Sequence, residues 1–496
     1  MSFAFNLPLF LVVLSLVTSV VASVLPRRWA RGVVLGLSLA SVLANIVVFL
    51  ALDGSAVTYM MGHFPHPWGN EIRLSPLEAL ISIVFSLVLF LTMLGGEKHL
   101  ADRVPAWKEG YFYVMCALVQ ASMLVLVYTN DIFTGYVFIE ICTISSCGLL
   151  MIRRNGKTIL ASVRYMIFAL VGSGLFLFGV IFLYNITGHL LMPNLRESVV
   201  ELWKSGAYRL PLLTAICLIT VGLGIKSGLC PFHLWMADTY GAAIPMASGI
   251  LSGLVSKAYI FFLVKIILCV FSPEVFYASG IQNVIFGLGV CGIVIGSLGA
   301  IGENNILRMT AFSSAAQIGY VYMGIGISPT LGILAAVFHM VAHAVTKPAI
   351  FLSAGMLSDS MGGAKKFKNL QGAGFVNPVA GVAFTIESFS MIGIPLSMGF
   401  VSKYMFGVAA FESRGKMLWT LVALAISTIL NTLYFARTIL RLYNRDYEKR
   451  PVVRWNKELS YTIAAVLFVA LNLYFGIFSK PFVEVLSKAL TVFQEI

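Results

Sequence analysis

Five charged side chains interrupt stretches of sequence that are otherwise almost wholly apolar: Glu140, Lys226, Lys257, Lys347 and Lys403. A charge at the centre of a lipid bilayer costs about 2.5–3.5 kcal/mol on insertion scales, so a row of such residues is hard to explain by packing alone. Ionisable residues inside membranes usually mark an ion or proton path. These five are therefore predicted to carry protons or other ions through the protein.

Glu140 is the acid at depth in the apolar run that begins at Asp131. Its protonation depends on burial and on how close a lysine lies, which makes it a switchable group. The alternative is a structural glutamate paired with one fixed lysine. Asp131, at the mouth of the run, is more typical of a helix N-cap than of a proton relay.

Lys226 stands five residues before Pro231, in a segment loosened by nearby glycines. Proline removes a backbone hydrogen bond, so the pattern predicts a broken transmembrane helix. Half-helix ends at membrane depth are a common way to build ion sites in transporters. His233, just past the break, could pass protons to the surface, or it could be a hydrogen-bonded packing residue.

Lys257 follows a run of small residues, Gly249, Ser252, Gly253 and Ser256, which favours close approach of neighbouring helices. Lysine exchanges protons readily in buried sites, which suits it to a relay. Lys265, eight residues further on, is expected to snorkel from the end of the same span.

His339, His343 and Lys347 are spaced i, i+4 and i+8, which predicts one helical face that carries two imidazoles and an amine. Histidine titrates near neutral pH, so this pattern favours a proton wire. A metal site is less favoured, because no acid lies nearby and no H-E-x-x-H motif is present.

A second broken helix is predicted around Pro395, between Gly393 and Gly399. Lys403 lies in its second half. Glu387, eight residues before the proline, is another acid at membrane depth. Its partner, either Lys347 or Lys403, is left open by the sequence.

The composition predicts an all-α polytopic membrane protein. Hydrophobic residues make up 59% of the 496 residues and charged residues only 11%. Apolar runs of roughly 20 residues, each able to cross a hydrocarbon core of about 30 Å, recur from end to end. The fourteen predicted spans are centred near Val13, Leu43, Ser86, Leu118, Cys142, Val171, Leu223, Ser256, Cys291, Ile318, His343, Ile392, Leu424 and Phe468.

The formal net charge of +13 arises from basic residues in short loops, which favours a role in membrane topology over nucleic-acid binding. The basic clusters lie at 27–31, 98–108, 153–164, 365–368 and 437–457. All fall on odd-numbered loops of the fourteen-span count, which predicts that these loops are cytoplasmic. Both termini are then expected outside.

The seven cysteines lie in or beside apolar runs, without a C-x-x-C motif or a His/Cys cluster. Iron–sulfur, haem and nucleotide-binding signatures are also lacking. We therefore expect no cofactor and no metal in this chain, and no redox or hydrolytic site. Any redox chemistry is expected in another subunit.

Taken together, these motifs resemble the antiporter-like family shared by respiratory complex I, Mrp-type Na+/H+ antiporters and membrane-bound hydrogenases. The resemblance covers most of the chain. It rests on a run from Asn130 to Glu140, IKSGLCPFHLWMADTY from Ile225, SGLVSK to Lys257, HMVAHAVTKPAIFLSAG from His339, and a GIP segment that ends in GFVSK at Lys403.

The resemblance implies fourteen helices with two inverted five-helix repeats. The implied parts are N-terminal helices 1–3 in 1–108, a first repeat (helices 4–8) in 109–270, a second repeat (helices 9–13) in 278–445, and helix 14 with the tail in 458–496. Glu140 and the four lysines then form a hydrated charged axis. It also implies partner subunits of an Mrp, hydrogenase or complex I-like assembly in a prokaryotic cell membrane.

Two residues depart from the family pattern. Glu387 has no counterpart in it, and Arg164 stands where members tend to carry a lysine, although a guanidinium cannot share a lysine's titration. The chain also stops soon after the last predicted span, without a long lateral helix. That favours an Mrp-type or hydrogenase-type subunit, or one of the two shorter complex I homologues.

Three functions compete. The first is a subunit that translocates protons, or Na+ and protons, within a larger assembly. The second is a self-sufficient secondary transporter of a small solute, although no cluster of aromatic and polar residues suggests an organic substrate pocket. The third is a non-conducting scaffold subunit, which would tolerate loss of its buried charges. A lysine-lined axis suits protons better than Na+.

Overall fold

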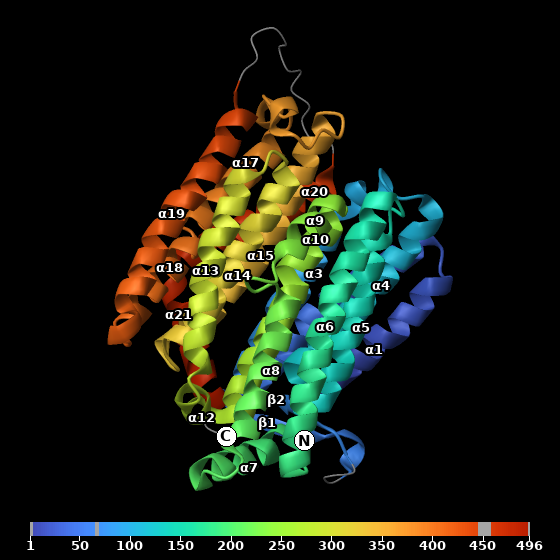
Figure 1. Ribbon diagram of the computed structural model, residues 1–496. Coiled ribbons are helices and arrows are strands. Elements are labelled where there is room, and N and C mark those ends of the chain that lie inside the picture. Colours follow the sequence, from blue (N-terminus) through green and yellow to red (C-terminus); the bar gives the residue numbers. More distant parts are fainter. Residues whose placement is uncertain (1–2, 65–68, 445–457, 495–496) are drawn as a thin grey trace.

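The protein is built almost entirely from helices that run side by side between two ends (Figure 1). The structure, a computed structural model, describes residues 3–64, 69–444 and 458–494. The helices of the first half are α1 (Leu7–Val24), α2 (Arg27–Ala51), α3 (Pro76–Ala101), α4 (Ala106–Tyr128), α5 (Ile132–Met151), α6 (Gly156–Thr187), α7 (Met192–Ser205), α8 (Arg209–Ser227), α9 (Leu234–Ala242), α10 (Pro245–Ile250), α11 (Ser256–Ile266) and α12 (Ser272–Ala278).

The second half follows the same all-helical plan. It comprises α13 (Ile281–Gly302), α14 (Ile306–Ile327), α15 (Leu331–Ser360), α16 (Ala373–Val376), α17 (Pro378–Ile392), α18 (Met398–Ala410), α19 (Arg414–Leu442), α20 (Leu459–Ile477) and α21 (Ser479–Gln494). Short 3₁₀ turns lie at η1 (Phe3–Asn6), η2 (Met61–His63) and η5 (Phe367–Asn369). An antiparallel hairpin pairs β1 (Val57–Met60) with β2 (Glu71–Leu74).

Twelve helices in the described part of the chain are long and apolar enough to cross a membrane. They include the unbroken helical run Pro245–Ala278, which contains α10, α11 and α12. The expectation of an all-α polytopic membrane protein is therefore confirmed. Two predicted spans are not among the twelve: the one near Ile318 falls on α14, and the one near Ile392 falls on the α17–α18 pair.

Both predicted helix breaks are present. α8 ends at Ser227, where Gly228 takes a positive φ of 88°, and α9 begins only at Leu234. α17 ends at Ile392, where Gly393 has a φ of 91°, and α18 begins at Met398. A left-handed glycine after the last helical turn is the common way to end a helix, so the glycines as well as the prolines set these breaks.

Glycine also allows the helices to approach closely. A Cβ added at Gly172 of α6 would lie 2.8 Å from the carbonyl oxygen of Gly222 of α8. A Cβ at Gly319 of α14 would lie 2.6 Å from the carbonyl oxygen of Gly289 of α13. Small residues at helix crossings are how membrane helices gain packing contacts without a hydrophobic driving force.

The basic loops gather at one end of the molecule. Arg27 pairs with Glu109 at 2.6 Å, which joins the start of α2 to the start of α4. Arg103, after α3, forms an ion pair with Asp359 near the end of α15. Lys98 pairs with Glu458 before α20 at 3.2 Å. Of the predicted cluster at 437–457, residues 445–457 lie outside the described residues.

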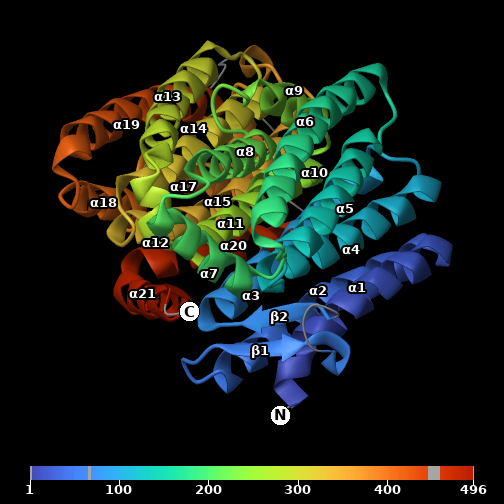
Figure 2. The same ribbon diagram turned by 60° about the horizontal axis from the view of Figure 1, so that its bottom comes forward.

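The same end encloses a cavity of about 540 Å³, whose lining includes Arg153, Arg164, Arg308 and Lys365. Burial, together with the nearby charges of Arg103 and Arg153, lowers the pKa of Lys365 to about 8. At the opposite end lie both chain termini, the hairpin, α7 and α12 (Figures 1 and 2). Figure 2 shows α21 beside the hairpin at this second end, which we call the termini end.

Several elements were not predicted from the sequence: the β hairpin, α7, α21 and two π-helical turns. The π turns η3 (Leu251–Val255) and η4 (Ile267–Phe271) flank α11 in the unbroken run. α21 buries Phe482, Leu486, Leu490 and Phe493 against the protein. π turns occur frequently at functional sites, and here they bracket both lysines of α11.

The end that carries the basic loops is expected to face the cytoplasm. A reporter enzyme fused after Asn444 should be active on the cytoplasmic side, and one fused after Ile496, itself outside the described residues, on the external side. Fusions within 153–157 provide the control, since that loop lies at the same end of the molecule as the other basic loops. An external signal at Asn444 contradicts this orientation.

Candidate functional site

The predicted charged residues are placed by five different elements. Glu140 projects from α5, Lys226 from the last turn of α8, Lys257 from α11, Lys347 from the middle of α15, and Lys403 from α18. Lys226, Lys257 and Lys347 are fully buried, whereas Lys403 is partly buried and Glu140 has 24% of its side chain exposed.

Glu140 and Lys226 lie next to each other. Lys226 Nζ is 3.6 Å from Glu140 Oε1, which has no hydrogen-bond partner among the described residues. The same ammonium donates at 2.7 Å to the hydroxyl of Thr143, one turn further along α5, and lies 5.3 Å from the centre of the Tyr259 ring. The ammonium is therefore held mainly by a neutral hydroxyl, with the carboxylate at the edge of contact.

His233 lies directly beyond the first break, in the segment 228–233 that separates α8 from α9. Its side chain is buried, and neither ring nitrogen has a hydrogen-bond partner in the part of the chain that the structure describes.

Lys257 is held by the helix that carries it. Its ammonium donates to the carbonyl oxygen of Ser252, inside the π turn η3, and at 3.2 Å to the hydroxyl of Ser256. No carboxylate forms an ion pair with Lys257 among the described residues. A π turn shifts the helical hydrogen bonds by one residue, so it is a suitable place for a carbonyl to accept from a side chain.

The helix of Lys257 crosses the helix of Lys347 at close range. A Cβ added at Gly253 of η3 would lie 2.4 Å from Cγ of Pro348, the residue after Lys347. Lys347 Nζ donates at 2.6 Å to the hydroxyl of Ser313 and at 3.1 Å to the carbonyl oxygen of Thr310, both on α14. Glycine is needed in η3 because this approach leaves no room for a larger side chain.

The two histidines of α15 form a stack, as their spacing predicts. The rings of His339 and His343 lie nearly parallel, at 8°, with centres 6.2 Å apart. His339 Nδ1 is 2.6 Å from the hydroxyl of Ser402 on α18, whereas neither nitrogen of His343 has a partner among the described residues. Lys347 continues along the same helix, one turn beyond His343.

Lys403 of α18 places its ammonium at the second helix break. Its ammonium donates at 2.6 Å to the carbonyl oxygen of Ile392, the last residue of α17, and at 3.0 Å to the hydroxyl of Thr428. Terminal carbonyls have no partner within their own helix and lie at the negative end of its dipole. The cation therefore satisfies a group that the break has exposed.

Glu387 lies apart from these lysines. Among the described residues it forms no ion pair with Lys347 or Lys403; instead its Oε2 accepts from Asn472 Nδ2 of α20 at 2.6 Å. Asn472 Oδ1 in turn accepts from the Ser390 hydroxyl at 3.0 Å and from the Met398 backbone N–H at 3.1 Å. One amide thus joins the buried acid to both sides of the second break.

Asp131 caps α5, as expected. Its side chain accepts from the backbone N–H of Thr134 at 2.5 Å. Arg164, the second departure from the family pattern, forms an ion pair with Asp238 of α9 at the basic end. Arg308 also reaches Asp238, at 2.6 Å.

The expectation for Lys265 is wrong. Its side chain does not snorkel but is completely buried in an ion pair with Glu78 of α3. α4 packs against α11, Glu78 of α3 pairs with Lys265, and α21 packs against the turn that follows α11, so the lysine meets protein where the sequence suggested lipid or water. Glu78 and the buried Arg73 were missed; their signal was a pair of charges that flank the Ser75–Pro76 helix start.

The site has no recognisable metal centre. Among residues 3–64, 69–444 and 458–494, no group of three or more His, Cys, Asp or Glu side chains could hold a metal ion. The arrangement instead offers ammonium groups, imidazoles and carboxylates at depth, held by hydroxyls and backbone carbonyls. Such groups can bind and release protons.

Comparison with known proteins gives consistent matches. Residues 129–430 match the family model described as NADH:quinone oxidoreductase/Mrp antiporter, TM. The NADH-quinone oxidoreductase subunit N of Desulforudis audaxviator is 30% identical over 88% of this chain and 86% of its own length. A Na(+)/H(+) antiporter subunit of Bacillus subtilis is 24% identical over 90% of this chain and 89% of its own.

Solved structures share the fold. A chain of the Mrp complex from Dietzia sp. DQ12-45-1b superimposes with a TM-score of 0.88 at 24% identity, covering 100% of this chain and 98% of that one. A chain of the archaeal membrane-bound sulfane sulfur reductase gives a TM-score of 0.89 at 24% identity, covering 99% and 98%.

The bridging role of Asn472 generates a prediction about stability. Asn472→Leu should lower the free energy of unfolding by about 1–3 kcal/mol, because it removes the partner of the Glu387 carboxylate and of the Met398 N–H and the acceptor of the Ser390 hydroxyl. Thermal unfolding of the detergent-solubilised protein measures the change. Val466→Ala, at an exposed position of the same helix, is the control and should change little. Equal stability of the Asn472 variant and the control contradicts the role.

Proposed function

The chain belongs to the NADH:quinone oxidoreductase/Mrp antiporter transmembrane family, and from that premise we propose that it is the ion-translocating, antiporter-like subunit of a multi-subunit membrane complex. The ions it moves are protons, carried along Glu140, Lys226, Lys257, Lys347 and Lys403, with His339 and His343 between the last two lysines. Asp131, His233 and Glu387 are secondary candidates on the same route.

One observation carries the proposal: lysines buried at membrane depth with neutral partners. Lys257 and Lys347 are held by hydroxyls and backbone carbonyls, and Lys226 lies 3.6 Å from its carboxylate. A scaffold would gain nothing from ammonium groups in such places, because an unpaired buried charge is strongly destabilising. A group that must alternate between charged and neutral forms, however, requires surroundings that tolerate both.

The mechanism we propose is charge-coupled transfer. With Glu140 close, Lys226 is stabilised as an ammonium; when a neighbouring subunit draws the carboxylate away, Lys226 loses that support and its proton moves toward Lys257. A unit charge pair at 4 Å in an effective dielectric of about 20 is worth about 4 kcal/mol, or close to a thousandfold in proton affinity. The partial exposure of Glu140 supports contact with such a neighbour.

The finer architecture belongs to the same proposal. Fourteen spans result if α14 and the broken pair α17–α18 are added to the twelve long apolar helices. Two inverted repeats, 109–270 and 278–445, then each contain one broken helix. Lys226 precedes the first break in sequence, and Lys403 follows the second. Residues 1–108 and 458–496 flank the repeats.

The parent assembly is proposed from the relatives. Similar proteins include an NADH-quinone oxidoreductase subunit N, an F(420)H(2) dehydrogenase subunit N and Na(+)/H(+) antiporter subunits. Purification of the native complex, followed by identification of the co-purifying subunits, distinguishes a redox-driven assembly from an Mrp antiporter. The cell membrane of a prokaryote is the proposed location, with both termini external.

The rival functions have less support. A transporter of an organic solute requires a pocket beside the charged axis, yet the cavity of about 800 Å³ lies between α7 and α12 and the basic cavity lies at one end. Neither is lined by a residue of the axis. A non-conducting scaffold is opposed by the buried lysines themselves.

Neutralising the first pair should stop transport. Glu140→Gln and Lys226→Ala should each reduce ΔpH formation in membrane vesicles at least about tenfold, because the charge that drives proton transfer is lost. Assembly of the complex should persist. Glu201→Gln and Lys204→Ala, on the exposed face of α7, are the matched controls and should transport normally. Wild-type ΔpH formation in either axis variant refutes the proposed role.

Lys347 tests whether titration is required. Lys347→Ala should be the severest lesion on α15, since it removes the amine at the end of the histidine stack. Lys347→Arg keeps the charge but cannot release a proton, so it should fail nearly as badly. His343→Ala should be milder, because water can bridge the gap left by an imidazole. Coupled transport by the assembled complex is the measurement. Normal transport by the arginine variant would mean that Lys347 supplies only a fixed positive charge.

A further inference from the structure

A buried ion pair lies at the termini end, apart from the charges assigned above. Lys265 of α11 and Glu78 of α3 pair with each other, and both side chains are 0% exposed. The Lys265 ammonium also donates to the carbonyl oxygen of Val127 at 2.7 Å, whereas Glu78 Oε2 lacks a partner among the described residues. Desolvation of such a pair can exceed its Coulombic gain, so stability alone does not account for it.

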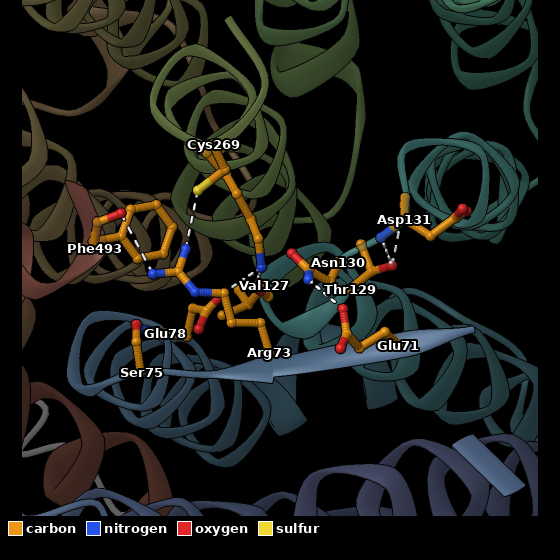
Figure 3. A network of polar contacts seen from close by, with 11 residues as sticks. Glu71, Arg73, Ser75, Glu78, Val127, Thr129, Asn130, Asp131, Cys269 and Phe493 are labelled. Carbon is orange, nitrogen blue, oxygen red and sulfur yellow. Dashed lines mark hydrogen bonds and ion pairs between the residues drawn. The ribbon is translucent and has the colours of Figure 1, made fainter. Parts of the chain in front are cut away.

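Arg73 adds a second buried cation beside the pair. Its Nη1 donates to Cys269 Sγ at 3.0 Å and its Nη2 donates to the carbonyl oxygen of Phe493 at 3.4 Å (Figure 3). The guanidinium also lies over the Phe493 ring, 4.2 Å from its centre. Two cations therefore share this site with a single directly paired carboxylate. Tyr128 of α4 and Arg196 of α7 are the further titratable groups that interact with the site electrostatically.

The C-terminal helix α21 covers the site. Phe493 lies in its last turn, where carbonyl groups have no partner within the helix and the helix dipole is negative. Arg73 binds one of these carbonyls, while Phe482, Leu486 and Leu490 are buried against the rest of the protein. α21 thus covers the Arg73 guanidinium with both the ring and the carbonyl oxygen of Phe493.

Lys265 shares one helix with Lys257. Eight residues of α-helix separate the two amines by about 12 Å along the axis. The π turn η3 ends just before Lys257 and the π turn η4 begins just after Lys265. Lys257 has no acid partner among the described residues, whereas Lys265 has one, so the helix leads from the proposed axis to a carboxylate near the termini end.

We propose that Glu78 and Lys265 form a second proton-exchange site, through which protons leave the axis beneath α21. In the transfer, an N–H bond of the Lys265 ammonium breaks and an O–H bond forms on Glu78, which leaves a neutral amine and a carboxylic acid. The proton then passes from the carboxylic acid to water at the termini end, which restores the carboxylate, while Arg73 keeps its permanent positive charge in the same site. The amine then takes a proton that arrives through water from Lys257. This inference rests on the proposed function.

A doubly neutral variant separates transport from packing. Glu78→Gln combined with Lys265→Met removes both charges of the pair, so no buried partner is left unpaired. In vesicles that contain the whole complex, this variant should assemble at the wild-type level, while ΔpH formation falls at least about tenfold. The matched control is Glu201→Gln with Lys204→Met on exposed α7 positions, which should transport normally. Normal transport by the Glu78/Lys265 variant overturns the proposal.

Cys269 provides an independent readout that does not depend on how the double variant folds. Its thiol is buried and contacts Arg73, so it reports water entry at the site. The other cysteines of the chain are first replaced by serine or alanine: Cys116, Cys142, Cys147, Cys217, Cys230 and Cys291. A charged, membrane-impermeant methanethiosulfonate is then added to each face of the membrane in turn.

Labelling of Cys269 from the face of the termini end should be slow at rest. It should rise at least about fivefold during turnover, and also at rest in Phe493→Ala, which loosens the cover over Arg73. Labelling that does not change during turnover, or that occurs from the opposite face, overturns an exit beneath α21. If Glu140→Gln transports normally, the proposed function fails; if it abolishes transport while the double variant works, only this second site fails.

Discussion

The structure depends on how an ammonium group is held where water is scarce. Carboxylates are few along the row of lysines, so most of the oxygen atoms that solvate the amines are neutral. The ammonium of Lys226 donates a hydrogen bond to Thr143, and that of Lys347 donates to Ser313. The ammonium of Lys403 donates to the carbonyl oxygen of Ile392. Neutral acceptors stabilise a charged amine without fixing it in that form. The same surroundings can therefore hold the amine after its proton has left.

Irregular helix geometry supplies many of these oxygens. A regular helix uses its backbone carbonyls internally, and only ends, π turns and breaks release them. The carbonyl of Ile392 is free because α17 stops at a left-handed glycine, and that of Ser252 lies inside a π turn. The breaks and π turns are thus part of the site, and the close crossing of Gly253 with Pro348 brings two of the lysine-bearing helices together.

The acids are distributed differently from the lysines. Glu140 stands at a partly exposed edge of α5, Glu387 is bound by Asn472 on α20, and Glu78 is paired with Lys265 beneath α21. Each carboxylate lies on the margin of the central row. In the proposed mechanism, protons or charges enter and leave at these carboxylates. The lysines between them carry the charge across the protein.

The sequence by itself determined the type and depth of the charged residues, the all-helical membrane class, both helix breaks, the N-cap at Asp131 and the family. These features are local, because charge in an apolar run, proline with glycine, and residue spacing are all visible along one segment. The amphipathic pattern of α21 was also visible, although its significance was missed. Only the tertiary structure decided the partners. Glu387 meets an amide where a lysine was expected, and Lys265 is buried, because a residue near a helix end faces water, lipid or protein according to which other helices pack around it.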